Sequence, residues 1–96
     1  MHVAVCQISL HIYTSHSLKD KRRTVASLCE RIRQRYPVSV AEVSGQETWQ
    51  RAVLGIAVVS GEETTAREIV EKAAEFARMN AQDAEVTQVD YDVFDY

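Results

Sequence analysis

Apolar and polar positions are most clearly ordered in the middle of the chain, over residues 38–60. This segment reads as a strand at 38–43, a polar turn at Ser44–Glu47 and a second strand at 49–60. The run Ala52–Val59 is the most hydrophobic of the sequence, and its β-branched and leucine side chains are typical of a central strand with two covered faces. We therefore expect a β-hairpin on which the rest of the chain packs.

The sequence before the hairpin predicts a strand over 2–13 and a helix over about 18–36. Alternate residues of the strand are all apolar and should face the core: Ala4, Cys6, Ile8, Leu10 and Ile12. Ser17 is the predicted N-cap of the helix, supported by Asp20 three residues later. Pro37 should end the helix, because the residue before a proline avoids the helical region. Apolar residues at helical spacing form one stripe: Leu18, Val25, Leu28, Cys29, Ile32 and Tyr36.

The sequence after the hairpin predicts a second helix over about 62–79 and a last strand over 85–94. Ser60 begins an S-G-E-E sequence that is typical of a helix N-cap. The buried stripe of this helix is predicted to be Ala66, Ile69, Val70, Ala73, Phe76 and Ala77. Apolar and acidic residues alternate along the last strand and give it one acidic face: Val89, Asp90, Tyr91, Asp92 and Val93.

The predicted order of elements is β-α-β-β-α-β. Two right-handed crossovers then give an antiparallel sheet in the order 4-1-3-2, with both helices on one face. This is an α+β, ferredoxin-like sandwich, and a length of 96 residues fits a single domain over 1–96. A small doubly wound sheet fits less well, because a tight turn rather than a helix joins the second and third strands.

Composition narrows the environment and the chemistry of the chain. No apolar run approaches the roughly 20 residues of a membrane span, and no basic leader precedes the first strand, so we expect a cytoplasmic protein. Cys6 and Cys29 form no C-x-x-C pair, and His2, His11 and His16 have no metal-ligand spacing. The expectation is therefore two reduced core thiols, with no metal and no cofactor.

Positive charge is concentrated in the first half of the chain. Residues 1–51 contain eight Lys/Arg and four Asp/Glu, whereas residues 52–96 contain three and ten. The densest group lies in the first turns of the first helix: Lys19, Lys21, Arg22 and Arg23. Cations at a helix start oppose the helix dipole, whereas the free backbone N–H groups there bind anions. We therefore predict that this group binds phosphate.

Helical spacing extends the predicted anion site along one flank. At about 100° per residue, Lys19, Arg22 and Arg33 share a flank that suits a phosphate backbone, while Arg31 and Arg35 lie towards the opposite side. The alternative is a solvated helix face whose charge is balanced by acids elsewhere.

The tip of the hairpin is a second candidate contact. Trp49 and Arg51 lie close to amide and acidic side chains, and such a pair can stack a base or anchor a protein partner. The alternative is that Trp49 covers the end of the core.

The helix-free face of the predicted sheet is unusually apolar. It should carry Val3, Val5, Val53, Gly55, Ala57 and Val59. An apolar patch of this kind indicates a homodimer or another partner. RNA-recognition domains with this architecture place aromatic residues on the central strands, where only His11 and Tyr13 are candidates here.

Enzymatic interpretations have little support in the sequence. The three glycines form no phosphate-binding loop. Ser9 with His11, and Glu42 with Glu47, lack an oriented third partner, so no catalytic residue is predicted. Regulation by a small ligand remains an alternative, although no glycine-rich ligand loop supports it.

Two motifs resemble the YlxP-like family of small bacterial proteins of unknown function. The first is S-L-K-x-K-R, formed by Ser17, Leu18, Lys19, Lys21 and Arg22. The second begins with V-S-V-A-E-V at 38–43 and continues as Q-x-x-W-Q-R-A-x-L-G-x-A: Gln46, Trp49, Gln50, Arg51, Ala52, Leu54, Gly55 and Ala57. The resemblance covers nearly the whole chain and implies a ferredoxin-like fold without an established catalytic residue or cofactor. Because such proteins are commonly encoded near translation and ribosome-maturation factors, it also implies a ribosomal partner.

The leading hypothesis is a non-enzymatic cytoplasmic adaptor that binds structured RNA or the ribosome. Its predicted contacts are Lys19, Lys21, Arg22, Arg23, Arg33, Trp49 and Arg51. The second hypothesis is a homodimeric structural or regulatory module that uses its open sheet face to bind a protein or a small ligand.

Overall fold

The computed structural model describes residues 1–45 and 47–96. Within these residues six elements follow one another: β1 (His2–His11), α1 (Leu18–Arg35), β2 (Ser39–Ser44), β3 (Arg51–Ser60), α2 (Glu63–Asn80) and β4 (Glu85–Asp95). Their order is the predicted β-α-β-β-α-β. Gln46, which was predicted to form part of the hairpin turn, lies outside the described residues.

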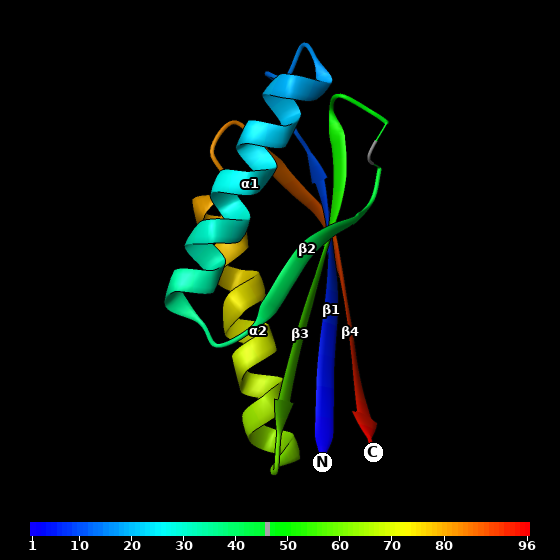
Figure 1. Cartoon of the computed structure of the whole chain (residues 1–96), viewed down its shortest axis with the longest axis vertical. Helices are drawn as coiled ribbons and strands as arrows, with labels where there is room; N and C mark the ends of the chain where they lie inside the picture. Colours follow the sequence, from blue (N-terminus) through cyan, green and yellow to red (C-terminus); the bar gives the residue numbers. More distant parts are fainter. Residues whose placement is uncertain (46) are drawn as a thin grey trace.

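The four strands form one antiparallel sheet in the order β2-β3-β1-β4, which confirms the predicted order. Strand β1 pairs with β3 so that Val5 lies opposite Ala57, and its other edge pairs with β4. Both helices lie on the same side of the sheet (Figure 1), and the other side is left uncovered. Bulges interrupt the β1–β4 pairing after Ser9 and the β2–β3 pairing after Glu42.

The core lies between the sheet and the helices. The predicted inward row of β1 is buried throughout, and Ala52, Leu54, Ile56 and Val58 form the matching row of β3. These two strands are central because their alternating apolar faces are the longest in the chain. Strand β1 ends at His11 rather than Tyr13, yet Ile12 stays fully buried and its N–H donates to the Gln50 carbonyl at 2.7 Å.

The two helices confirm the predicted stripes and correct one predicted cap. In α1, Ser17 is the N-cap, and its hydroxyl accepts the Asp20 N–H at 3.1 Å. In α2 the N-cap is Glu62, which makes no side-chain cap bond. Ser60 is instead the last residue of β3, and its hydroxyl accepts the Glu62 N–H at 3.1 Å. The buried positions of α2 are valine and alanine, and such small residues let a helix approach the sheet closely: Ala66, Val70, Ala73, Ala74 and Ala77.

Three connections meet at one end of the molecule. The loop after β1, the β2–β3 hairpin and the α2–β4 loop all lie at the end opposite the chain termini (Figure 1). At the terminal end, the Met1 ammonium donates to the Tyr96 carbonyl at 2.7 Å. The start of α1 and the start of β3 therefore lie at the same end, although they are far apart in sequence.

Replacing Ser17 with alanine should lower the free energy of unfolding by about 1 kcal/mol, because the first turn of α1 loses its side-chain cap. Urea denaturation followed by circular dichroism measures the change. Thr65→Ala on the exposed side of α2 is the control and should change the stability by less than about 0.5 kcal/mol. Equal losses in the two variants would contradict a capping role for Ser17.

Candidate functional site

Three cations at the start of α1 face solvent. Lys19, Arg22 and Arg23 are all exposed. In the part of the chain that the structure describes, none of the three forms an ion pair with a carboxylate. The one acid of the first turn is Asp20, whose carboxylate accepts the His16 N–H at 3.4 Å. We call Lys19, Arg22 and Arg23 the α1 cation cluster, and its charge is directed outwards.

Lys21 does not belong to this cluster, and the prediction that it contacts an outside phosphate is wrong. Its side chain is fully buried. The ammonium lies 3.0 Å from the Glu42 carboxylate and donates to the carbonyls of Gly45 at 2.5 Å and Arg51 at 3.3 Å. A buried cation needs such partners, because losing its hydration is costly. Lys21 therefore acts as a structural tie between α1 and the β2–β3 hairpin.

The sequence carried a signal for the position of Lys21. Residue 21 lies four positions before Val25, so it falls on the apolar stripe of α1. A long cationic side chain on a buried stripe indicates an internal partner, and Glu42 on β2 supplies it. The pairing itself depends on how the helix packs against the hairpin.

Arg33 is separated from the α1 cation cluster. Fourteen residues of helix place it about 21 Å along the axis from Lys19. Its guanidinium donates to the Val40 carbonyl at 2.7 Å and lies 3.6 Å from the Glu30 carboxylate. The predicted Lys19–Arg22–Arg33 flank is thus divided into a solvent-facing start and an end that contacts β2.

Trp49 and Arg51 lie at the same end of the molecule as the α1 cation cluster. Trp49 precedes β3 instead of starting it, and it is 52% exposed, so it does not close the core. Arg51 is exposed, while its carbonyl accepts the Lys21 ammonium. The Gln50 amide between them donates to the Ser15 carbonyl at 3.1 Å. These bonds hold the hairpin against the β1–α1 loop.

His11 and Tyr13 lie next to this hairpin. Their rings meet edge to face with centroids 6.2 Å apart, and Tyr13 is 53% exposed. His11 lies directly opposite Arg51 in the β1–β3 register. The two predicted aromatic candidates therefore lie beside Arg51 at the end of the uncovered sheet face.

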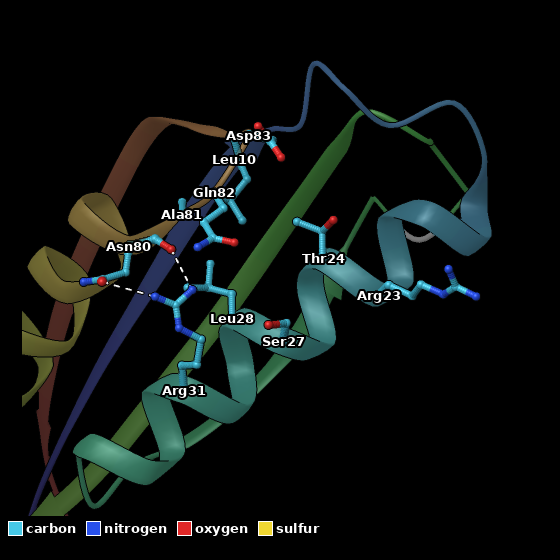
Figure 2. Close-up of a pocket in the computed structure, with 11 residues that line it drawn as sticks. Leu10, Arg23, Thr24, Ser27, Leu28, Arg31, Asn80, Ala81, Gln82 and Asp83 are labelled. Carbon is cyan, nitrogen blue, oxygen red and sulfur yellow. Dashed lines mark hydrogen bonds between the residues drawn. The ribbon is translucent and has the colours of Figure 1, made fainter.

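Arg31 has a structural contact that the sequence reasoning missed. Its guanidinium donates to the Asn80 carbonyl at 3.0 Å and to the Asn80 side-chain oxygen at 3.1 Å. Figure 2 shows Arg31 reaching from α1 to the end of α2, while the Arg23 side chain extends away from this contact. A cation at the carbonyl end of a helix interacts favourably with the helix dipole, so Arg31 stabilises the end of α2. The contact borders a polar hollow of about 230 Å³, and no local sequence pattern announces it because it joins two helices.

Residues 3–91 match the family model described as "Protein of unknown function (DUF503)". The chain belongs to this family. A stretch of 40 residues is 40% identical to the "Uncharacterized protein YlxP" of Bacillus subtilis (strain 168), and it covers 42% of this chain and 44% of YlxP. The resemblance to the YlxP-like family is confirmed, and the match spans less than half the length of that relative.

The fold also has a counterpart among solved structures. A solution NMR structure of a de novo designed protein with a ferredoxin fold, LFR1 1, superposes with a TM-score of 0.55. The match covers 100% of this chain and 87% of the designed protein at 14% identity. At that identity the likeness supports the ferredoxin-like fold and nothing about function.

The described residues of this DUF503 protein include two buried thiols and no group of three or more metal-ligating side chains. Burial raises the pKa of Cys6 to about 11, with the Asp90 carboxylate as a second cause. Burial also raises the pKa of the Cys29 thiol. Both thiols are therefore protonated at neutral pH, which makes them poor nucleophiles. Neither helix of the described chain is long and apolar enough to cross a membrane.

Replacing Lys21 with methionine should lower the free energy of unfolding by about 3–5 kcal/mol, because the Glu42 carboxylate loses its buried counter-charge. Adding Glu42→Gln should recover part of this loss, since the charge left behind is removed. Chemical denaturation of the two single variants and the double variant measures the coupling. Lys19→Met is the matched surface control and should cost less than about 0.5 kcal/mol. Additive single losses would contradict the Lys21–Glu42 tie.

The Cys6 thiol should stabilise the fold at neutral pH and cease to do so in strong base. Its pKa is about 11 in the folded chain against an ordinary value of 9.0, so ionisation favours the unfolded chain. The contribution is fully present below about pH 9 and is lost as the pH rises through 11. Iodoacetamide at neutral pH should therefore label the native protein slowly and the urea-unfolded protein quickly. Rapid labelling of native Cys6, located by mass spectrometry, would contradict this.

Proposed function

We propose that this protein is a non-enzymatic, cytoplasmic adaptor that binds structured RNA. The observation that carries the proposal is the α1 cation cluster, which has three exposed cations and no ion pair within the described chain. The resemblance to the YlxP-like family favours ribosomal RNA as the form that the protein meets in the cell.

The position of the cluster supports a role outside stability. Positive charge in the first turn of a helix costs about 0.3–1 kcal/mol per residue. Lys19 lies in the first turn of α1, and Arg22 and Arg23 follow in the second. Helix α2 follows the stabilising pattern, with Glu62 and Glu63 at its start. An RNA phosphate at the start of α1 would meet both the side-chain cations and the free N–H groups, and so would compensate the unfavourable charge.

The hairpin supplies a second contact of a different kind. Trp49 offers an exposed aromatic face on which an unpaired base can stack, and Arg51 offers a guanidinium for a phosphate. Lys21 bonds to the Gly45 and Arg51 carbonyls and so holds this hairpin in a fixed relation to α1. A folded RNA that presents phosphates and a loop base together would engage both contacts at once.

The triple variant Lys19/Arg22/Arg23→Ala should fold normally and bind RNA more weakly. Binding of a structured ribosomal RNA fragment should fall steeply with salt for the wild type, because phosphate contacts release counterions. The slope of log affinity against log salt should decrease by about 2–3 in the triple variant, at roughly one unit per lost contact. Fluorescence anisotropy at several salt concentrations measures both quantities.

A charge-matched control separates the cluster from net charge. Arg67/Lys72/Arg78→Ala on α2 also removes three exposed cations and should leave the affinity and the salt slope close to those of the wild type. Equal losses of RNA affinity in the two triple variants would show that binding depends only on net charge and not on the α1 cation cluster. Wild-type binding that is absent, or insensitive to salt, would overturn the proposal and leave the α1 cation cluster as a solvated helix face.

A further inference from the structure

The uncovered sheet face has a neutral apolar centre and an acidic border. Outward residues of β1 and β3 lie opposite each other in the pairs Val3–Val59, Val5–Ala57, Gln7–Gly55 and Ser9–Val53. The apolar area extends sideways to three exposed side chains: Val43 (49%), Val59 (60%) and Phe94 (50%). On the β4 edge, Asp92 and Asp90 lie beside Val5 and Gln7. A water-facing antiparallel sheet normally carries polar residues at its centre. The apolar centre of this face therefore indicates that a partner covers it.

The centre of this face is also hollowed. A groove of about 430 Å³ runs over β1, β3 and β2, and its rim includes Val5, Gln7 and Val43. Its floor contains Gly55 and Ala57, the smallest outward residues of β3. A Cβ atom at Gly55 would lie 2.8 Å from the Val43 side chain, so Val43 already occupies the space above this glycine. The face therefore has larger side chains on β1 beside smaller ones on β3.

The face is large enough for a small dimer interface. Ten residues of β1 extend about 33 Å at 3.3 Å each, and four strands are about 19 Å wide. The projected area is thus about 600 Å², before side-chain relief is added, against about 800 Å² per partner in a standard interface.

We propose that the uncovered face binds a second copy of this chain, about a two-fold axis parallel to the strands, so that the strands of both copies run in the same direction. This axis places β1 of one copy over β3 of the other. At the centre, where the crossing of about 30° between packed sheets displaces residues least, Val5 meets the partner's Ala57, and Gln7 meets the Val43 side chain that lies above the partner's Gly55. The larger Val5 side chain therefore faces the smaller Ala57 side chain.

The opposite arrangement is disfavoured by shape and by charge. A two-fold axis perpendicular to the strands would place β3 over β3, so the Gly55 and Ala57 floor would face itself and leave a gap. It would also place β4 over β4, so Asp90 and Asp92 would face carboxylates of the other copy. Like charges facing each other in an interface cost several kcal/mol. In the proposed arrangement these acids lie over the small neutral residues Ser39 and Ala41 of the partner's β2.

The direction of the strands also decides where the basic ends lie. In the proposed dimer the two α1 starts and the two hairpins are at the same end, so the two α1 cation clusters lie at one end of the dimer, one in each outer helix layer. This consequence rests on the proposed RNA-binding function, and it predicts that one RNA engages both copies with greater avidity than either alone. The dimer itself rests only on the sheet face, and its oligomeric state is measured without RNA.

Sedimentation equilibrium of the wild type should give the mass of a dimer. Ala57→Glu places a carboxylate at the centre of the interface and should raise the dimer dissociation constant by about 100-fold or more. Ala26→Glu on the exposed side of α1 is the matched control and should leave the dimer unchanged. Val59→Asp, at a position that is 60% exposed in one copy, repeats the test where folding is not at risk, and it too should weaken the dimer. A monomeric wild type, or equal effects of the face and control variants, would overturn the proposal.

The direction of the strands has its own measurement. Thr14→Cys allows a spin label in the exposed β1–α1 loop, while Cys6 and Cys29 are buried and stay unlabelled in the native protein. Pulsed dipolar spectroscopy should find an inter-label distance clearly shorter than the 42 Å long axis of one copy. A distance near or above 42 Å would overturn the same-direction arrangement.

Discussion

The contacts of the Lys21 ammonium fix the arrangement of α1 and the hairpin at the end of the molecule opposite the chain termini. The ammonium joins the second turn of α1 to the Glu42 carboxylate on β2 and to backbone carbonyls on both sides of the hairpin. A buried ion pair of this kind adds little net stability compared with an apolar pair, but it allows few alternative positions. Gly45 and Arg51, whose carbonyls accept from this ammonium, are therefore held against the start of α1, although neither residue belongs to the apolar core.

This tie divides the cations of α1 by their partners. Lys21, Arg31 and Arg33 all donate to backbone carbonyls and pack α1 against the hairpin, the end of α2 and β2. The α1 cation cluster remains directed at solvent. Counting charges along α1 overstates the surface charge, because three of its seven cations donate to internal carbonyls. The α1 cation cluster is gathered at one end of the helix, which is a more specific surface than a stripe along its whole length.

The two proposed interactions use different surfaces of one sandwich. Its helices cover one face of the sheet and leave the other to a partner, while the start of α1 and the exposed Trp49 lie at the end opposite the termini. Strand β1 connects the two surfaces, since Val3 and Val5 lie in the apolar part of the open face and His11 lies beside Arg51 at its basic end. The α1 cation cluster stays accessible when the sheet face is covered, whereas Arg51 lies at the margin of that face.

The elements, their order and the buried side of each strand and helix follow from local patterns in the sequence. Alternation in β1 and the helical stripes of α1 and α2 are local periodicities, and one sheet order with right-handed crossovers accommodates them. Ser17 was recognisable as a cap because its partner Asp20 is three residues away. Ser60 was misassigned as the cap because the helix begins two residues later than expected, so the Ser60 hydroxyl bonds to the N–H of Glu62, which precedes the helix.

The tertiary structure decided which charges are available. Lys21 and Lys19 differ by two positions, and only the packing of α1 on the hairpin buries the first and exposes the second. The partner of Arg31 is 49 residues away in the sequence. The partner of Lys21 is Glu42, which lies on another element, so no local pattern contains either contact. Periodicity within one element shows which side of that element faces inwards. The partner of a charged side chain depends instead on how two elements pack together.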